Sequence, residues 1–348
     1  MIPIFDGHND VLLRLWRNGD RDGEAFFSGE AEGRAKGHVD LPRAKEGGFA
    51  GGFFAIYVMP RKPPRNQKLA VQSGFAAEPQ DYAMKVASEQ ASILLRLERL
   101  SEGGFRIVQT AKEIRKARRD GVIAAIFHME GAEAIGPDLA ELDLFYAAGL
   151  RSLGPVWSRP TIFGHGVPFK FPHSPDTGPG LTEAGERLVR RCNELKILID
   201  LSHMNEKGFW DIARLSDSPL VATHSNVHAI CPSARNLTDK QLDAIAESKG
   251  LVGLNYAVAF LRTDGAHRSE TPLDIMTRHL AYLVEKLGED GVALGSDFDG
   301  AMVPRAIGDV AGVQNLVEAM GKAGFGRTLT RKICHTNWEN LLARIWGE

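Results

Sequence analysis

GVIAAIFHME, residues 121–130, is the stretch that decides the fold. It runs through apolar and β-branched residues from Val122 to Phe127 and then ends on His128 and Glu130. An unbroken apolar run of this length is typical of a strand buried on both faces, as in a parallel sheet. We therefore expect residues 121–130 to lie inside an α/β fold.

Similar runs recur along the chain, separated by longer stretches with helical periodicity. The strand-like runs are 2–8, 51–58, 121–130, 150–157, 196–203, 219–225, 250–258 and 291–300. The helical patterns are 80–101, 111–119, 137–148, 182–195, 205–215, 238–248, 271–288, 309–323 and 328–346. Eight strands are the number that closes a (β/α)8 TIM barrel. The first run leads into GHND rather than the glycine-rich loop of a dinucleotide-binding sheet. The sequence predicts a single (β/α)8 barrel domain over residues 1–348.

Composition excludes several other classes of protein. With 43% hydrophobic and 25% charged residues, the 348 residues bury a large core without disulfides, and three scattered cysteines suit a reducing compartment. A net charge of −2 offers no footprint for nucleic acid, and RKPPRNQK (61–68) is interpreted as a solvated loop. No apolar run reaches the roughly 18 residues of a membrane span, and no signal peptide is evident. We expect a cytoplasmic protein that binds neither nucleic acid nor membrane.

Residues 159–181 form the exception to the strand–helix rhythm. RPTIFGHGVPFKFPHSPDTGPGL is rich in proline and glycine and shows no hydrophobic period. Long irregular loops in compact barrels are usually functional. We expect this loop to lie over the site.

Residues of the types that commonly bind metals lie at the ends of most strand-like runs. They are His8, Asp10, His128, Glu130, His203, His224, Asp297 and Asp299. In a parallel barrel the carboxyl ends of the strands converge on one mouth, and residues i and i+2 of a strand share a face. A single histidine at a strand end is more often structural, and aspartates next to glycines are common in turns. Their recurrence on separate strands favours a metal site.

The residue types point to the kind of metal. Imidazole and carboxylate ligands without thiolates suit Zn²⁺ or a similar divalent ion. Three histidines and two carboxylates exceed the needs of one tetrahedral ion, and with a shared carboxylate they are expected to be able to hold two ions about 3.5–4 Å apart. The remaining histidines show no such placement. His38, His173, His267 and His279 are interpreted as surface or core residues, and a structural role is favoured for His228 and His335.

Six motifs together resemble the membrane (renal) dipeptidase family of metallopeptidases, peptidase family M19, on an amidohydrolase-like barrel. They are DGHND (6–10), MEGAEAI (129–135), DLSH (200–203), THSN (223–226), RN (235–236) and GSDFDG (295–300). Their order and spacing match the family over essentially the whole chain. The combination is specific, although each motif alone is weak.

The resemblance implies a two-zinc site and a role for each matching residue. His8 and Asp10 would hold one ion, His203 and His224 the other, and Glu130 both. Arg235 would bind the substrate's C-terminal carboxylate, a task suited to a guanidinium fork. Asp297 would move the proton between an attacking bridging hydroxide and the departing amine.

One departure from the family pattern concerns the oxyanion contact. Family members of the renal type have a histidine after strand four, and aligning RSLGPVW places Trp157 there. His165, in the proline- and glycine-rich loop, is the nearest substitute. We hypothesise that His165 supplies the oxyanion contact, or that Trp157 reshapes the pocket and alters substrate choice.

Three functions remain open at this point. The first is a zinc dipeptidase that cleaves L-Xaa–Xaa dipeptides with an L or D residue at the C-terminal position. The second is a related hydrolase of another small amide or lactam, such as an N-acyl amino acid. The third is a catalytically silent binding barrel, which the competent ligand set argues against. A homodimer is one assembly that the sequence allows.

Overall fold

The computed structural model describes residues 1–61 and 75–348, and within these residues every strand belongs to one sheet. The strands are β1 (Ile4–Asn9), β2 (Phe49–Tyr57), β3 (Phe105–Ile107), β4 (Ile123–Glu130), β5 (Leu150–Gly154), β6 (Leu198–Ile199), β7 (Val221–Ser225), β8 (Leu251–Asn255) and β9 (Val292–Gly295). The eight predicted runs correspond to β1, β2 and β4 to β9. Beyond Arg61, the predicted loop 61–68 lies outside the described residues.

The strands form a nearly closed parallel barrel in the order β6-β5-β4-β2-β1-β9-β8-β7. The two end strands meet at a parallel bridge between Asp200 and Val221, where the Leu201 N–H donates to the Val221 carbonyl at 2.8 Å. The short β3 lies outside this order and pairs with the start of β4. The predicted (β/α)8 barrel is confirmed.

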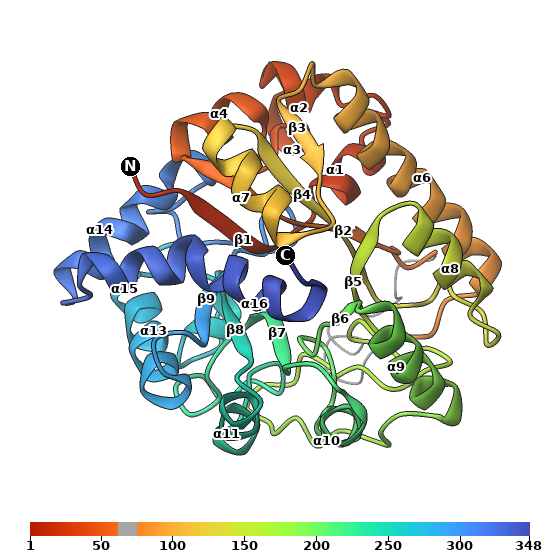
Figure 1. Cartoon of the computed structure of the whole chain (residues 1–348). Helices are drawn as coiled ribbons and strands as arrows, with labels where there is room; N and C mark the ends of the chain where they lie inside the picture. Colours follow the sequence, from red (N-terminus) through yellow and green to blue (C-terminus); the bar gives the residue numbers. More distant parts are fainter. Residues whose placement is uncertain (62–74) are drawn as a thin grey trace.

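Helices surround the strands (Figure 1). They are α1 (Val11–Arg17), α2 (Glu24–Ser28), α3 (Gly33–Lys36), α4 (Leu41–Gly47), α6 (Gln80–Leu100), α7 (Ala111–Asp120), α8 (Ala140–Ala147), α9 (Glu183–Leu195), α10 (Glu206–Leu215), α11 (Asp239–Glu247), α12 (Val258–Leu261), α13 (Leu273–Leu287), α14 (Gln314–Lys322), α15 (Arg327–Arg331) and α16 (Asn337–Trp346). In α9, the buried residues Leu188, Val189 and Cys192 recur at helical spacing, which gives the helix one apolar face toward the core. No helix of the described residues has both the length and the hydropathy needed to cross a membrane.

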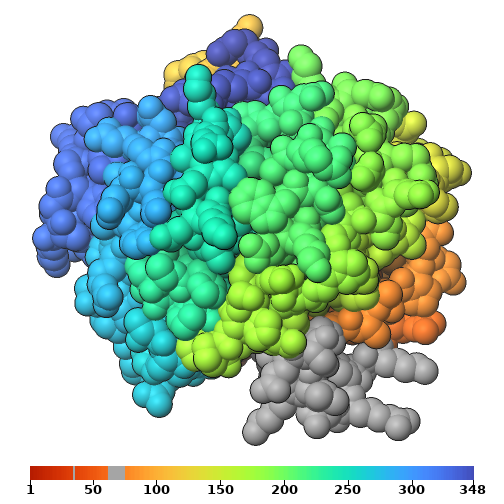
Figure 2. Space-filling view, turned by 90° about the horizontal axis from the view of Figure 1, so that it is seen from below, coloured from red at the N-terminus to blue at the C-terminus, as the bar shows by residue number. Residues whose placement is uncertain are grey.

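The barrel interior is filled by large side chains and closed at one end by α16. Phe5 and Phe53 point inward from β1 and β2 and belong to one apolar cluster with Trp338, Leu341 and Leu342 of α16. The Trp338 indole N–H donates to the Leu294 carbonyl at 3.0 Å. Figure 2 places the dark blue C-terminal helix at the top and the yellow-green segment around residues 160–180 toward the opposite end. The helix therefore covers the amino ends of the strands and leaves the carboxyl ends for the site.

Some predicted elements differ from the structure in detail. The strand β3 is missed by the hydrophobic pattern because it has three residues and its central Arg106 is exposed. The pattern over 328–346 predicts one helix, but the chain forms α15, a π-helical turn η2 (Lys332–Thr336) and α16 in direct succession. Likewise 309–323 begins as a 3₁₀ turn, η1 (Val310–Val313), before α14. Such turns change the backbone hydrogen bonds without breaking the apolar period, so periodicity does not reveal them.

Candidate metal centre and active site

The carboxyl ends of five strands bring the five predicted ligands and Asp297 together. His8 lies in β1, Glu130 ends β4 and His224 lies in β7. Asp10 directly follows β1, and His203 and Asp297 lie in the turns after β6 and β9. All six side chains are buried or nearly so.

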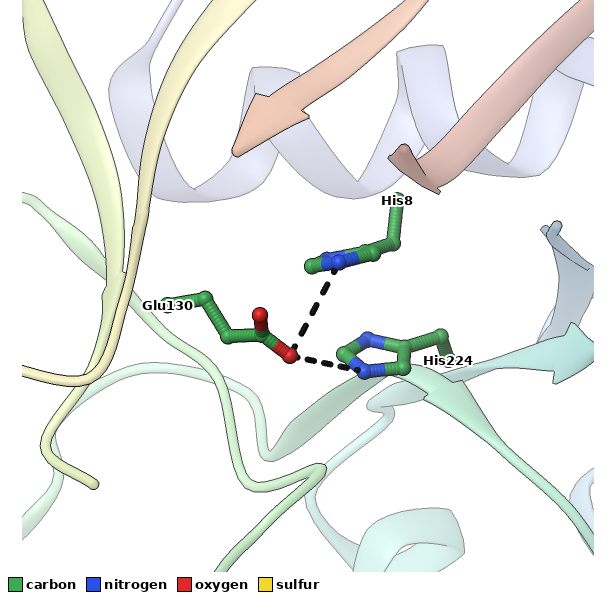
Figure 3. Close-up of side chains that lie close together, drawn as sticks. All are labelled: His8, Glu130 and His224. Carbon is green, nitrogen blue, oxygen red and sulfur yellow. Dashed lines mark ion pairs between the residues drawn. The ribbon is translucent and has the colours of Figure 1, made fainter. Parts of the chain in front are cut away.

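Glu130 lies at the centre of this cluster. Its Oε1 is 2.9 Å from His203 Nε2, 3.5 Å from His224 Nε2 and 3.7 Å from His8 Nε2. Figure 3 shows the carboxylate directed at the rings of His8 and His224, which stack with 3.9 Å between their centroids. One carboxylate oxygen therefore faces imidazoles from three different strand ends.

Ligand atoms of the cluster fall into two overlapping groups. His8, Glu130 and His224 form one, and His8, Asp10 and Asp297 form the other, with the ligand atoms of each group within 4.8 Å of one another. His8 Nε2 lies 3.4 Å from Asp10 Oδ2. Together these residues offer more ligand atoms than one tetrahedral ion uses.

The cluster contains buried nitrogen and oxygen atoms that have no hydrogen-bond partner among the described residues, and such atoms are suited to bind metal ions. Both ring nitrogens of His8 and Oδ1 of Asp10 are buried without a hydrogen-bond partner in the described part of the chain. His203 Nε2 and His224 Nε2 lie 3.1 Å apart. Two lone pairs at that distance repel each other unless a proton or a cation lies near both. Buried polar atoms without partners are costly, and a bound ion satisfies them.

The electrostatics of the cluster also favour a cation. Burial raises the pKa of Glu130 well above its usual range, and the carboxylates of Asp10 and Asp297 add to this, although His8 opposes it. Burial alone would lower the pKa of His8, but Glu130 and Asp10 outweigh it and raise that pKa to about 10. Burial lowers the pKa of His203 and that of His224 well below the usual range. Carboxylates crowded into a buried site stay ionised most easily beside a bound cation.

Asp297 faces the cluster from the turn after β9. The Asn255 amide donates to its Oδ2 at 2.9 Å, and its backbone N–H donates to the His8 carbonyl at 3.0 Å. A Cβ on Gly300 would lie 2.1 Å from Asp10 Oδ2 and 2.5 Å from Asp297 Oδ1. Glycine at position 300 therefore lets these two carboxylates approach each other.

The period-two argument predicts that Asp297 and Asp299 share a face, and this prediction is wrong. The Asp299 carboxylate accepts from Arg14 Nε at 2.9 Å and from the His38 backbone N–H at 2.5 Å. The strand β9 already ends at Gly295, and Asp297 and Asp299 have φ values of 59° and 68°. Alternation holds only in extended backbone, so the two side chains diverge. Asp299 instead joins α1 and the segment before α4 to this turn.

His128 shares the face of Glu130 but lies deeper in the barrel. Two residues along a strand span roughly 6–7 Å, so His128 is below the level of the ligands. Its Nδ1 lies 2.9 Å from Ser152 Oγ, and its Nε2 lies 3.7 Å from Asp200 Oδ2. His128 is therefore part of the layer that supports the cluster.

Arg235 is buried against the cluster rather than exposed. Its Nη2 donates to the His224 carbonyl at 2.9 Å and lies 3.2 Å from His203 Nε2, and its Nη1 donates to Ser225 Oγ at 2.8 Å. Its Nε has no partner among the described residues. Burial lowers the pKa of Arg235 to about 10, so the guanidinium keeps its charge at neutral pH. It offers an unused donor and a positive charge next to the ligands.

A cavity of about 590 Å³ reaches the cluster, with Asp10, Glu130, His203 and Asp297 in its wall. Much of the remaining wall is aromatic, from Tyr57, Phe75, Trp157, Phe169, Phe171 and Phe260. The Trp157 ring lies 5.8 Å from the His203 ring at 35°, and 5.1 Å from the Tyr57 ring. Phe169 and Phe171 come from the irregular loop 159–181. Trp157 thus forms part of the cavity wall, next to a predicted ligand.

His165 is not among the residues that line this cavity. Its side chain is half-buried, and its carbonyl accepts from the Asn205 N–H at 3.4 Å. The other histidines vary. His279 is buried and bonded to the Val227 N–H and the Leu261 carbonyl, whereas His267 is exposed and lies in the cavity wall.

Several residues at the site are not predicted from the sequence. Tyr57 and Asn255 are the last residues of β2 and β8 but lie inside the predicted runs 51–58 and 250–258, and phenol and amide groups are not usual metal ligands. Ser158 and Thr223 contact ring nitrogens of His203 and His224 at 2.8 Å. The only sequence signal for Thr223 is its place in THSN, next to His224, and the only one for Ser158 is that it follows RSLGPVW.

Comparison with known proteins identifies the family of this chain. The sequence model of the membrane dipeptidase family (peptidase family M19) matches residues 1–348. A metallopeptidase from Rhodobacter sphaeroides, liganded with a phosphinate mimic of the dipeptide L-Ala-D-Ala, is 55% identical over 99% of both chains with a TM-score of 0.94. The solved dipeptidase AC, a metallopeptidase of family M19, is 55% identical over 100% of this chain and 99% of its own, with a TM-score of 0.92. An uncharacterized protein from the PQQ-III 3′ region of Acinetobacter calcoaceticus is 47% identical over 291 residues, which are 82% of this chain and 90% of the relative. The chain therefore belongs to the membrane dipeptidase family of metallopeptidases, peptidase family M19.

Proposed function

We propose that this chain is a two-zinc dipeptidase that hydrolyses L-Xaa–Xaa dipeptides with an L or a D residue at the C-terminal position. The observation that carries the proposal is the pair of overlapping ligand groups, with Glu130 facing three imidazoles. The L-Ala-D-Ala mimic bound to the Rhodobacter sphaeroides relative supports the substrate class and the D residue.

Each ligand has a place in this proposal. His8 and Asp10 would hold one ion, His203 and His224 the other, and Glu130 both. The bound zinc would supply a water of lowered pKa and an electrophile for the substrate carbonyl.

Other side chains bind the dipeptide and move its proton. Arg235 would bind the C-terminal carboxylate through its guanidinium, which lies next to His203 and His224. Asp297, held by Asn255, takes a proton during attack and delivers it to the departing amine. The aromatic wall and the loop 159–181 cover the peptide and restrict the access of water. The cytoplasmic location and the homodimer stay predictions.

Zinc analysis and a small substrate panel test the proposal. The protein loaded with zinc is expected to contain two equivalents and to hydrolyse L-Ala-L-Ala and L-Ala-D-Ala. N-acetylated dipeptides should resist, whereas an N-acyl amino acid hydrolase would prefer them. Full activity with fewer than two equivalents, or preference for the acetylated substrates, would contradict the proposal.

Arg235→Met is expected to raise KM for free dipeptides by roughly 10- to 100-fold, since a hydrogen bond to a charged group contributes about 1.5–3 kcal/mol. Dipeptide amides lack the carboxylate, so the substitution should change their kinetics much less. The ratio of kcat/KM for dipeptide and dipeptide amide measures this directly. An unchanged ratio would remove Arg235 from carboxylate recognition.

His165→Ala tests the predicted oxyanion contact. If His165 moves to the carbonyl oxygen of the bound substrate, its removal should lower kcat by roughly 10²-fold or more with little change in KM. Trp157→His is the companion variant, because it restores the family residue at the aligned position. An unchanged kcat in His165→Ala would exclude His165 as the source of the oxyanion contact. Trp157 would then be the residue that accounts for the departure from the family pattern.

A further inference from the structure

A buried chain of hydrogen bonds lies behind His224. Thr223 Oγ1 is 2.8 Å from His224 Nδ1 on one side and 2.6 Å from Asp200 Oδ2 on the other. All three side chains are at most 3% exposed. Water therefore does not replace these contacts, and the direction of each hydrogen bond is set by the protein.

The direction follows from counting protons. Asp200 is surrounded by donors, since Ser202 Oγ donates to Oδ1 at 2.6 Å and the Thr223 N–H donates to the same oxygen at 2.8 Å. A carboxylate only accepts, so the single hydroxyl proton of Thr223 goes to Asp200. The Thr223 oxygen must then accept from His224, which places the ring proton on Nδ1.

This assignment leaves the lone pair of His224 on Nε2. That nitrogen lies 3.5 Å from Glu130 Oε1, inside the ligand cluster. His203 is different, because its Nδ1 contacts Ser158 Oγ at 2.8 Å and that hydroxyl shows no second partner in the described residues. Ser158 is free to donate or to accept, so it does not fix the tautomer of His203.

We propose that Thr223 and Asp200 are positioning residues that hold His224 in the Nδ1–H tautomer, so that Nε2 is ready to bind zinc before the ion arrives. The proposal rests on the zinc site proposed above. Partners behind metal-bound histidines commonly orient the ring and fix its tautomer. Here the partner is a hydroxyl whose own proton is committed to a carboxylate.

Two substitutions at position 223 test the proposal. Thr223→Val keeps the side-chain shape and removes the hydroxyl, whereas Thr223→Ser keeps the hydroxyl. In competition with a chromophoric zinc chelator, Thr223→Val should bind one of its zinc ions roughly 10- to 100-fold more weakly than wild type. Thr223→Ser should bind both ions nearly as tightly as wild type.

Long-range ¹H–¹⁵N NMR of the zinc-free protein gives a second readout that needs neither metal nor activity. The His224 ring should show the Nδ1–H pattern in wild type and in Thr223→Ser. It should lose this pattern in Thr223→Val. An Nε2–H ring in wild type would overturn the proposal, even if Thr223→Val fails to fold.

Ser202→Ala is the control, because it removes another hydroxyl donor of Asp200 and the acceptor of the His224 backbone N–H, but no contact to a ring nitrogen of His224. Its zinc affinity should fall less than that of Thr223→Val. Equal losses in both variants would assign the effect to Asp200 and its surroundings and overturn the role of Thr223. Failure of wild type to bind zinc would instead overturn the proposed function, while the NMR result would still decide the tautomer.

Discussion

Glu130→Gln is expected to abolish hydrolysis and to remove most of the stabilisation that zinc gives to the fold. One oxygen of Glu130 faces His8, His203 and His224, so both proposed ions depend on this carboxylate. The amide has a similar size but no negative charge, and two divalent cations in a buried site need that charge. No other single side chain is shared by both ions in the proposal.

Unfolding experiments with and without zinc measure the effect. At a zinc concentration about 1,000 times Kd, binding to the folded state stabilises wild type by roughly 4 kcal/mol. In Glu130→Gln this difference should nearly vanish. The zinc-free variant should be no less stable than zinc-free wild type, because burial already raises the pKa of Glu130 and disfavours its charged form.

Glu133→Gln is the control, since Glu133 is also a buried carboxylate after β4 but pairs with Arg159 at 2.5 Å. Leaving that buried guanidinium unpaired should cost roughly 3–5 kcal/mol of stability. The increment from zinc should nevertheless remain. Two zinc equivalents bound to Glu130→Gln with wild-type affinity would contradict the shared-ligand model.

The sequence predicts the barrel and the ligand cluster because both depend on local pattern. A strand buried on both faces is recognisable from its own apolar residues, as in 121–130, and the closed parallel sheet brings its carboxyl ends together. His8, Glu130 and His224 are therefore expected at one end of the barrel without knowledge of any contact between strands, and the structure brings their side chains together. The nine strands of the described residues include β3, whose three residues carry too little pattern to be recognised.

The depth of a side chain in the barrel and the direction in which it points do not follow from the hydrophobic pattern in the same way. His128 and Glu130 share a face, but which of them reaches the cavity depends on where β4 ends against its neighbours, and Glu130 pairs with Gly154 at the end of β5. Asp299 diverges from Asp297 because the backbone turns to positive φ after β9. The contact of Asn255 with Asp297 joins residues 42 positions apart, and neither residue signals the other in the sequence. These features depend on tertiary packing.

Asp297→Asn is expected to lower kcat by roughly 10²- to 10⁴-fold, the range typical of a lost general acid–base group. The amide keeps the size of the side chain and, like aspartate, tolerates the positive φ of this turn. It does not take a proton from water or deliver one to an amine. The KM for dipeptides should change little, since Arg235 and the aromatic wall remain.

Zinc content separates this role from a second one that the geometry allows. Asp297 belongs to the ligand group with His8 and Asp10, so its free oxygen is close enough to bind an ion directly. If Asp297 only carries a proton, the Asp297→Asn variant should keep both zinc equivalents and should show only a lower kcat. As a ligand, its replacement should release one equivalent, and added zinc should restore part of the activity. Asp299→Asn is the control from the same turn, since its carboxylate is bonded to Arg14 and to the His38 backbone N–H and belongs to neither ligand group. The Asp299→Asn variant should be less stable but should keep its zinc and a kcat close to that of wild type. A fall in kcat that is confined to Asp297→Asn, with two zinc ions still bound, would assign the proton transfer to Asp297.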